Sequence, residues 1–182
     1  MSTYIALLRG INVSGQKLIK MNDLKSYFVS YGYKNVQTYI QSGNVVFESA
    51  KQESEKLSKK VGEQLTVSLG YIVPVIARSL SEWIILNEKN PYSKLKLKPD
   101  EHVYVTLLAT KPKPDLAQSL IALSDTTDEF QLNGKTVYIL CRKGYGNSKF
   151  SNNFIEKKLD TQATTRNLAT MQKLQMIAEG LK

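Results

Sequence analysis

The chain has 182 residues, 25 Lys and Arg against 16 Asp and Glu, a formal net charge of +9, and 42% hydrophobic residues. This composition is typical of a folded globular protein and argues against extended disorder. The single cysteine, Cys141, excludes an internal disulfide and a cysteine-rich metal site, and the single histidine, His102, disfavours a histidine-based metal centre or triad. The N-terminal apolar run is too short to span a membrane, so we expect a cytoplasmic protein without membrane contact, metal or bound cofactor.

The first half of the chain predicts strands and helices in the order of a split βαβ unit. In chain order we expect a strand over 4–9, a helix capped by Asn22 and closed by Gly32, strands over 36–41 and 45–48 around the turn Ser42-Gly43-Asn44, a helix over 57–69 and a strand over 72–77. The apolar positions of the helices recur at helical spacing, and glycine and asparagine mark the turns.

The second half repeats this order without visible sequence similarity to the first. A capping box at Ser79-Leu80-Ser81-Glu82 begins a short connecting helix. The elements expected after it are a strand over 103–108, a helix opened by Pro114, a hairpin at Asn133-Gly134, a helix capped by Ser151 and a last helix from about Arg166. We therefore predict an α+β fold with two ferredoxin-like subdomains, antiparallel sheets, and connecting and C-terminal helices. The predicted divisions are residues 1–78, 79–94 and 95–182.

The split βαβ topology brings two polar loops together. Its sheet has the strand order 4-1-3-2, so the end of the first strand lies beside the turn between the second and third. Polar loops at the end of a rigid sheet often carry binding sites, although turn chemistry alone also explains glycine and asparagine there. The candidate loop-site residues are Arg9, Asn12, Gln41, Ser42, Asn44 and Asn167. By the same topology, Lys111, Lys113 and Lys135 are expected at the matching edge of the second half.

Positive charge is concentrated in residues 142–173, which hold seven basic and two acidic side chains. Clustered basic charge is typical of proteins that bind polyanions, although solvated helix faces also produce it. Arg166 is expected in the first turn of the last helix, where a cation opposes the helix dipole and a bound anion would relieve the conflict. The candidate anion-binding residues are Arg142, Lys143, Lys149 and Arg166.

Three familiar nucleotide-binding patterns are incomplete in this sequence. Residues 10–17 approach a P-loop, but Gln16 and Lys17 stand where Lys and Ser or Thr are needed. The glycines of residues 144–146 lack the third glycine and the parallel βαβ setting of a dinucleotide fold. An RNA-recognition domain would need aromatic residues on its third strand, where only Phe47 is present.

Three segments resemble a known family. They are Leu7–Val13, Thr38–Phe47, and Glu156–Leu159 followed by Ala163–Asn167. They are similar to the signature segments of domain-of-unknown-function family 1697, with Ser14 in place of a usual second glycine and Leu168 in place of a common tryptophan. The resemblance extends over essentially the whole chain and implies a bacterial protein with two ferredoxin-like halves. It implies no activity or catalytic residue.

Three functional hypotheses follow. The first is a nucleic-acid-binding module that uses the basic segment 142–173, with Tyr145 stacking on a base. The second is an enzyme or sensor for a small phosphorylated metabolite, bound at the loops after the first strand and at the 41–44 hairpin. The third is an interaction protein without a ligand. The protein is expected to be a monomer or homodimer.

Overall fold

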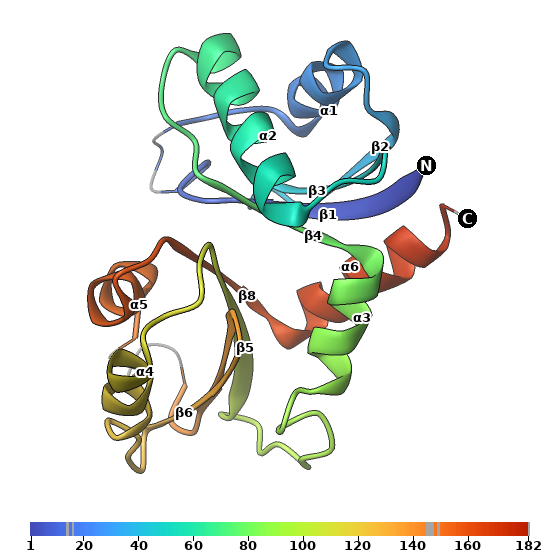
Figure 1. The fold of residues 1–182 in the computed structure, drawn as a ribbon. Coiled ribbons are helices and arrows are strands. Elements are labelled where there is room, and N and C mark those ends of the chain that lie inside the picture. The colour runs from blue at the N-terminus through green and yellow to red at the C-terminus, as the bar shows by residue number, and fades with distance from the viewer. Residues whose placement is uncertain (14, 16, 145–147, 149, 182) are drawn as a thin grey trace. The chain divides into compact units, whose positions relative to one another are not determined.

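The computed structural model describes residues 1–13, 15, 17–144, 148 and 150–181 (Figure 1). It divides into two compact units, of which unit 1 comprises residues 1–84 and 173–182 and unit 2 comprises residues 85–172. The predicted divisions at residues 78 and 94 stay predictions. None of the helices in the described part of the chain is long and apolar enough to cross a lipid bilayer.

Unit 1 contains the first split βαβ motif. Its elements are β1 (Ser2–Leu8), α1 (Met21–Ser30), β2 (Lys34–Tyr39), β3 (Asn44–Ser49), α2 (Ser54–Leu69), β4 (Val75–Ser79) and the start of α3 (Leu80–Glu88). The four strands form an antiparallel sheet in the order β2-β3-β1-β4. Helices α1 and α2 cover the same face of this sheet (Figure 1). The predicted strand order is therefore confirmed.

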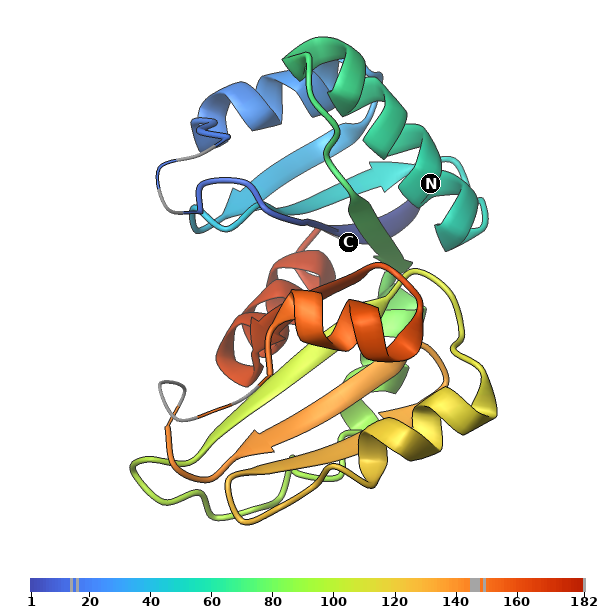
Figure 2. The same cartoon turned by 90° about the vertical axis from the view of Figure 1, so that its left-hand side faces the viewer.

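Unit 2 contains the second motif. Its elements are β5 (His102–Leu108), α4 (Pro114–Ile121), β6 (Asp128–Asn133), β7 (Thr136–Cys141), α5 (Asn152–Leu159), β8 (Ala163–Asn167) and the start of α6 (Leu168–Glu179). Its antiparallel sheet has the order β6-β7-β5-β8. Helices α4 (yellow) and α5 (orange) lie on one face of the sheet (Figure 2). The α+β fold with two ferredoxin-like subdomains is thus confirmed.

Each sheet buries alternate side chains beneath its helices. In unit 1 the core contains Phe47 of β3, whose ring centroid lies 5.1 Å from that of Phe28 and 4.7 Å from that of Tyr33. In unit 2, Phe150 and Ile155 belong to the corresponding core. Burying such aromatic and aliphatic side chains is the main stabilising contribution, and it fixes the register of each strand.

The pairings of β1 with β3 and β4 have the same register as the pairings of β5 with β7 and β8. Ile5 of β1 pairs with Arg78 of β4, and Val105 of β5 pairs with Arg166 of β8. In each sheet the end of the first strand is bonded to the turn of the neighbouring hairpin. The N–H of Leu8 donates to the carbonyl of Gly43 at 2.8 Å, and the N–H of Leu108 donates to the carbonyl of Lys135 at 2.9 Å. The duplication expected from element order therefore extends to individual backbone contacts.

The predicted start of the last helix is wrong. Thr164, Thr165 and Arg166 belong to strand β8, and α6 begins at Leu168. The β-branched threonines favour a strand, and the hydroxyl of Thr165 lies 2.7 Å from that of Thr106 on the neighbouring strand. The cap is Asn167, whose Oδ1 accepts from the N–H of Thr170 at 2.8 Å. Arg166 therefore does not oppose a helix dipole.

Other local predictions had mixed outcomes. Ser79 and Glu82 form the expected capping box, in which the N–H of Ser79 donates to Glu82 Oε2 at 2.8 Å. Ser151 caps α5 as expected, accepting from the N–H of Phe154. The cap predicted at Asn22 is wrong, because α1 already begins at Met21 and Lys20 is its cap residue.

Candidate functional site

Three loops meet at one edge of the unit 1 sheet. We call it the loop edge and define it as residues 9–13, 15, 17–20, 40–44 and 70–74. The N–H of Arg9 donates to the carbonyl of Pro74 at 2.9 Å. The side-chain amide of Asn12 donates to the carbonyl of Gln41 at 2.8 Å. The ammonium of Lys17 donates to the carbonyl of Ile72 at 3.1 Å and lies 5.3 Å from the ring centroid of Tyr71. The two loops that topology was expected to bring together are indeed in contact.

Asn12 anchors the first of these loops. Its φ of 52° is in the left-handed region, which asparagine tolerates better than most residues. Its Nδ2 donates to the carbonyls of Ile19 at 3.0 Å and Gln41 at 2.8 Å, and its Oδ1 accepts from the N–H of Ile19 at 2.8 Å. Since the amide makes three bonds to the backbone, Asn12 holds the loop in shape.

Asn44 has the same kind of role in the β2–β3 turn. It is fully buried, and its Nδ2 donates to the carbonyl of Tyr39 at 2.8 Å and to the hydroxyl of Ser42 at 3.0 Å. Gly43, between Ser42 and Asn44, has a φ of 76°. Both asparagines predicted as ligand contacts therefore contribute to loop geometry.

A pocket of about 510 Å³ opens at the loop edge, and we call it the loop pocket. Its described lining residues are Asn12, Leu18, Ile19, Lys20, Asp23, Tyr27, Gln41 and Leu69. Two of them, Asn12 and Gln41, are predicted site residues. The predicted residues Arg9, Ser42 and Asn44 lie in the same loops but outside this lining.

Several lining residues were missed by the sequence argument. Lys20 precedes α1 as its cap residue, and Asp23 lies in its first turn. Tyr27 of the same helix is only partly buried and packs against the core. The spacing of Lys20, Asp23 and Tyr27, at intervals of three and four residues, is the signal that places them on one face of the helix.

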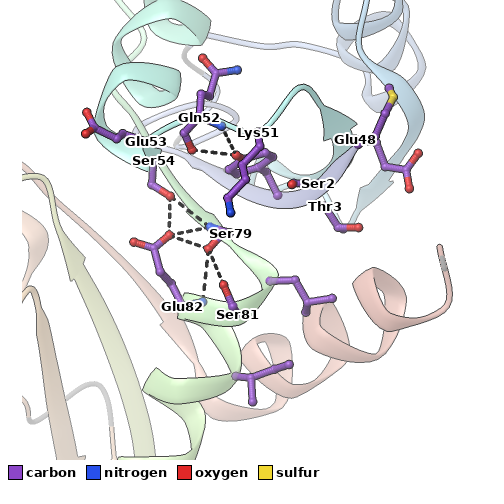
Figure 3. Close-up of a pocket in the computed structure, with 14 residues that line it drawn as sticks. Ser2, Thr3, Glu48, Lys51, Gln52, Glu53, Ser54, Ser79, Ser81 and Glu82 are labelled. Carbon is purple, nitrogen blue, oxygen red and sulfur yellow. Dashed lines mark hydrogen bonds between the residues drawn. The ribbon is translucent and has the colours of Figure 1, made fainter.

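A second pocket of unit 1, of about 640 Å³, lies between the starts of α2 and α3 (Figure 3). Its polar groups bond to one another, since Glu82 Oε2 accepts from Ser54 Oγ and from the N–H and hydroxyl of Ser79. Burial opposes ionisation of Glu82, but these hydrogen bonds and the nearby Arg78 guanidinium hold the pKa of the carboxyl below its usual value. A pocket lined by this anion and by Glu48 and Glu53 does not suit a phosphate.

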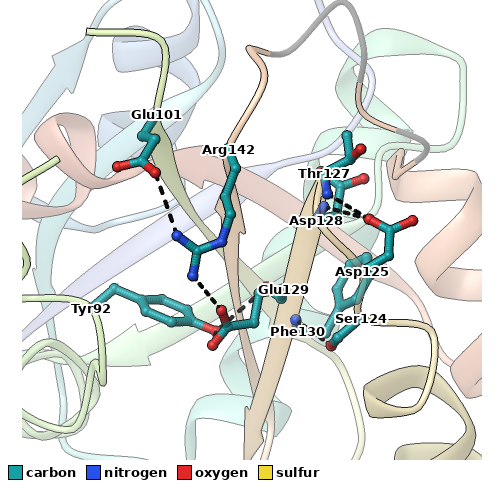
Figure 4. Close-up of polar contacts among 9 residues, drawn as sticks. All are labelled: Tyr92, Glu101, Ser124, Asp125, Thr127, Asp128, Glu129, Phe130 and Arg142. Atoms are coloured by element: carbon teal, nitrogen blue, oxygen red, sulfur yellow. Dashed lines mark hydrogen bonds and ion pairs between the residues drawn. The ribbon is translucent and has the colours of Figure 1, made fainter. Parts of the chain in front are cut away.

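In unit 2, Arg142 is held between two carboxylates (Figure 4). Its guanidinium donates to Glu129 at 2.7 Å and to Glu101 at 3.4 Å, and the hydroxyl of Tyr92 donates to Glu129 Oε1 at 3.2 Å. The positive charge of Arg142 is thus balanced locally, which disfavours the predicted phosphate contact. The neighbouring Cys141 is buried, which raises the pKa of its thiol to about 12, and the thiol donates to Asp128 Oδ1 at 3.2 Å.

Two of the other predicted anion-binding residues, Lys143 and Arg166, lie in the described part of unit 2. Arg166 lies on β8, where its guanidinium donates to the hydroxyl of Thr164 at 3.0 Å and to the carbonyl of Thr165 at 2.8 Å. Burial lowers the pKa of Arg166 to about 10. Lys143 is exposed after β7, and Lys149, like Tyr145, lies outside the described residues. The predicted site residue Asn167 caps α6.

Metal-ligating side chains do not gather in the described parts of the chain. No group of three or more His, Cys, Asp or Glu residues there could hold a metal ion. His102 is exposed at the start of β5. The candidate site of unit 1 therefore consists of the loop edge, Lys20 and the loop pocket.

Comparisons with known proteins identify a family and a fold. No curated protein matches the sequence. A solved structure, described as that of the conserved bacterial protein SP0830 from Streptococcus pneumoniae, aligns over 97% of this chain and 98% of its own with a TM-score of 0.74 and 19% sequence identity. At this identity the likeness shows a shared fold. The model of the family described as "Protein of unknown function (DUF1697)" matches residues 1–138. This range contains the first two signature segments and ends before those at residues 156–167. The resemblance to the family is thereby confirmed, and the chain belongs to the DUF1697 family.

Proposed function

We propose that unit 1 binds a small phosphorylated metabolite in the loop pocket. The observation that carries the proposal is the convergence of Asn12, Gln41 and Lys20 on one pocket at the end of a rigid sheet. Its volume of about 510 Å³ lies in the range usual for small-molecule sites.

The charge arrangement favours an anionic group close to Lys20. This residue occupies the N-cap position of α1, a helix of ten residues, and it lines the pocket. The N–H groups and the dipole at a helix amino end favour negative charge, and a lysine there adds a full positive charge. Asp23, in the first turn of α1, limits the anion to the Lys20 side of the pocket and favours a hydroxyl or amine donor near its carboxylate.

The remaining polar lining suits the body of such a ligand. Gln41 presents an exposed side-chain amide, which can donate and accept, and its carbonyl is fixed by Asn12. Tyr27 contributes a phenol ring that is partly buried and stacks on Tyr31 with ring centroids 6.5 Å apart. A sugar or ring compound bearing a phosphate matches these groups.

The test is a thermal-shift and calorimetric screen of phosphorylated sugars, nucleotides and inorganic phosphate. A true ligand at about 100 times its Kd stabilises the folded state by about 2.7 kcal/mol. Lys20→Ala and Gln41→Ala should abolish the ligand-induced shift while the ligand-free melting temperature stays close to wild type. Lys25→Ala removes an exposed lysine from the same helix outside the pocket lining and is the matched control. If no compound stabilises the protein, or the control loses the shift equally, the proposal is wrong.

The nucleic-acid hypothesis for residues 142–173 has less support. Arg142 is paired with Glu101 and Glu129, and Arg166 donates to groups of its own strand. Salt-dependent binding of oligonucleotides that Lys143→Ala weakens would favour it over the pocket. The cytoplasmic location and the monomeric or homodimeric state stay predictions.

A further inference from the structure

The edge of unit 2 that corresponds to the loop edge is built from three segments, residues 109–113, 133–135 and 157–162. The carbonyl of Lys135 accepts from the N–H of Leu108 at 2.9 Å, and the carbonyl of Gln162 accepts from the N–H of Ala109 at 2.9 Å. The hydroxyls of Thr110 and Thr161 lie 2.8 Å apart. These contacts place the three segments at one end of the sheet, and we call them the lysine edge.

Positive charge dominates the lysine edge. Its residues include five lysines, Lys111, Lys113, Lys135, Lys157 and Lys158, and one acidic residue, Asp160. Lys111, Lys113, Lys157 and Lys158 are exposed. Helix α4 begins at this edge with Lys113 as its cap residue and Pro114 in its first turn. The positive end of its dipole therefore adds to the lysine charge.

The lysine edge differs from the loop edge in its apolar surface. The loop edge exposes four aliphatic side chains, with exposed fractions of 58% for Val13, 72% for Leu18, 48% for Ile40 and 71% for Ile72. Among the described residues of the lysine edge, no large hydrophobic side chain is exposed. Protein interfaces are depleted in lysine and have an apolar core, so a protein partner fits this surface poorly.

We propose that the lysine edge binds the phosphate backbone of duplex nucleic acid without sequence preference. Lysines that neutralise phosphates and release counterions provide most of the affinity in this mode. The sequences of the three segments contain no aromatic residue, so they offer no platform for stacking unpaired bases. A duplex carries about one charge per 1.7 Å, a higher density than a single strand, and this favours the duplex.

This proposal is independent of the loop pocket, because it concerns residues of the other unit. It also differs from the hypothesis for residues 142–173. Of its five lysines only Lys157 and Lys158 belong to that segment, and neither was among the candidate contacts. The three proposals can therefore fail separately.

The experiment measures fluorescence anisotropy of a labelled duplex of about 20 base pairs between about 50 and about 200 mM NaCl. With five phosphate contacts the slope of log K against log salt is about −4.5, so binding weakens about 500-fold across this range. The triple variant Lys111→Ala/Lys113→Ala/Lys158→Ala should reduce the slope to about −1.8, so its binding weakens about 12-fold over the range. A single strand of the same sequence should bind more weakly than the duplex.

A matched control separates this edge from net charge. Lys94→Ala/Lys96→Ala/Lys98→Ala removes the same charge from exposed lysines before β5 and should keep the wild-type slope. Both triple variants should melt at the wild-type temperature. Absence of duplex binding at the lowest salt, an equal loss of slope in both variants, or a loss that only Lys143→Ala produces would overturn the proposal. Stronger binding to an acidic peptide than to the duplex would also overturn it.

Discussion

Replacement of Gly43 by alanine tests how the loop edge is built. Gly43 lies in the β2–β3 turn with a φ of 76°, and its carbonyl accepts from the N–H of Leu8. A Cβ on this residue would lie 2.6 Å from Cδ1 of Ile11 and 2.9 Å from Cβ of Leu8. Ile11 can move its terminal methyl group, whereas Cβ of Leu8 is fixed by the strand. The turn would therefore have to shift away from the end of β1.

The expected cost has two parts. A residue with a side chain in the left-handed region costs about 1–2 kcal/mol relative to its usual conformation. Forcing an extra methyl into a packed contact costs about 1–3 kcal/mol. We therefore expect Gly43→Ala to lower the free energy of unfolding by about 2–5 kcal/mol. Gly10→Ala is the matched control, because Gly10 has a φ of 74° in the same edge but no atom within 4 Å of an added Cβ. It should cost about 1–2 kcal/mol.

Urea unfolding monitored by the fluorescence of Trp83 measures both values. Trp83 is the only tryptophan of the chain and is fully buried in unit 1, so it reports on the unit that carries both glycines. Both variants pay the cost of the left-handed backbone. The difference between their losses in free energy of unfolding is therefore the cost of the contact with Leu8 and Ile11. If Gly43→Ala is no more destabilising than Gly10→Ala, the close approach of the turn to β1 does not exist as described.

Three further predictions concern single side chains. Asn12→Gly keeps the left-handed backbone but removes three hydrogen bonds, so the same unfolding assay should show a loss of about 1–3 kcal/mol, and an unchanged value would contradict the anchoring role. Glu82→Gln should destabilise the protein at neutral pH in urea titrations. Because the folded-state pKa of Glu82 is depressed, the carboxylate stabilises the protein fully above the ordinary value of 4.5, and this stabilisation is lost as pH falls through the folded-state pKa. The difference in free energy of unfolding between Glu82→Gln and wild type should therefore narrow at low pH. A difference that does not change with pH would refute this. The Cys141 thiol, whose pKa burial raises to about 12, should react with an aromatic disulfide reagent at neutral pH only after unfolding, and rapid labelling of the folded protein would count against its burial.

The sequence was most informative where local signals and topology agree. The turns at Ser42-Gly43-Asn44 and Asn133-Gly134, and the capping box from Ser79 to Glu82, depend on neighbouring residues alone. Once the element order predicts a split βαβ unit, the strand order is determined, and so is the contact between the loops of Asn12 and Gln41.

Side-chain partners that are distant in sequence could not be predicted. Arg142 pairs with Glu101, 41 residues away, and no local pattern indicates that this cation is neutralised. Arg166 was expected in the first turn of the last helix, whereas pairing with β5 extends the strand through Asn167. Helical spacing likewise indicates which face of α1 points to the core, but not that Tyr27 at its margin stays partly exposed and lines the loop pocket.

The duplicated architecture explains why one edge can carry a pocket and the other a basic surface. In both units the backbone closes the edge through equivalent bonds, from Leu8 to Gly43 and from Leu108 to Lys135. These bonds are made by backbone carbonyls, so the exposed side chains at each edge can differ without loss of the bonds. Unit 1 places glycine where the turn touches β1, and unit 2 places lysine at the equivalent position. The loops also differ, since Tyr39 pairs with Asn44 across a four-residue turn and Asn133 pairs with Thr136 across a two-residue turn. A difference in what the two edges bind therefore comes from loop length as well as side chains, and variants that exchange the side chains without loss of stability would separate the two contributions.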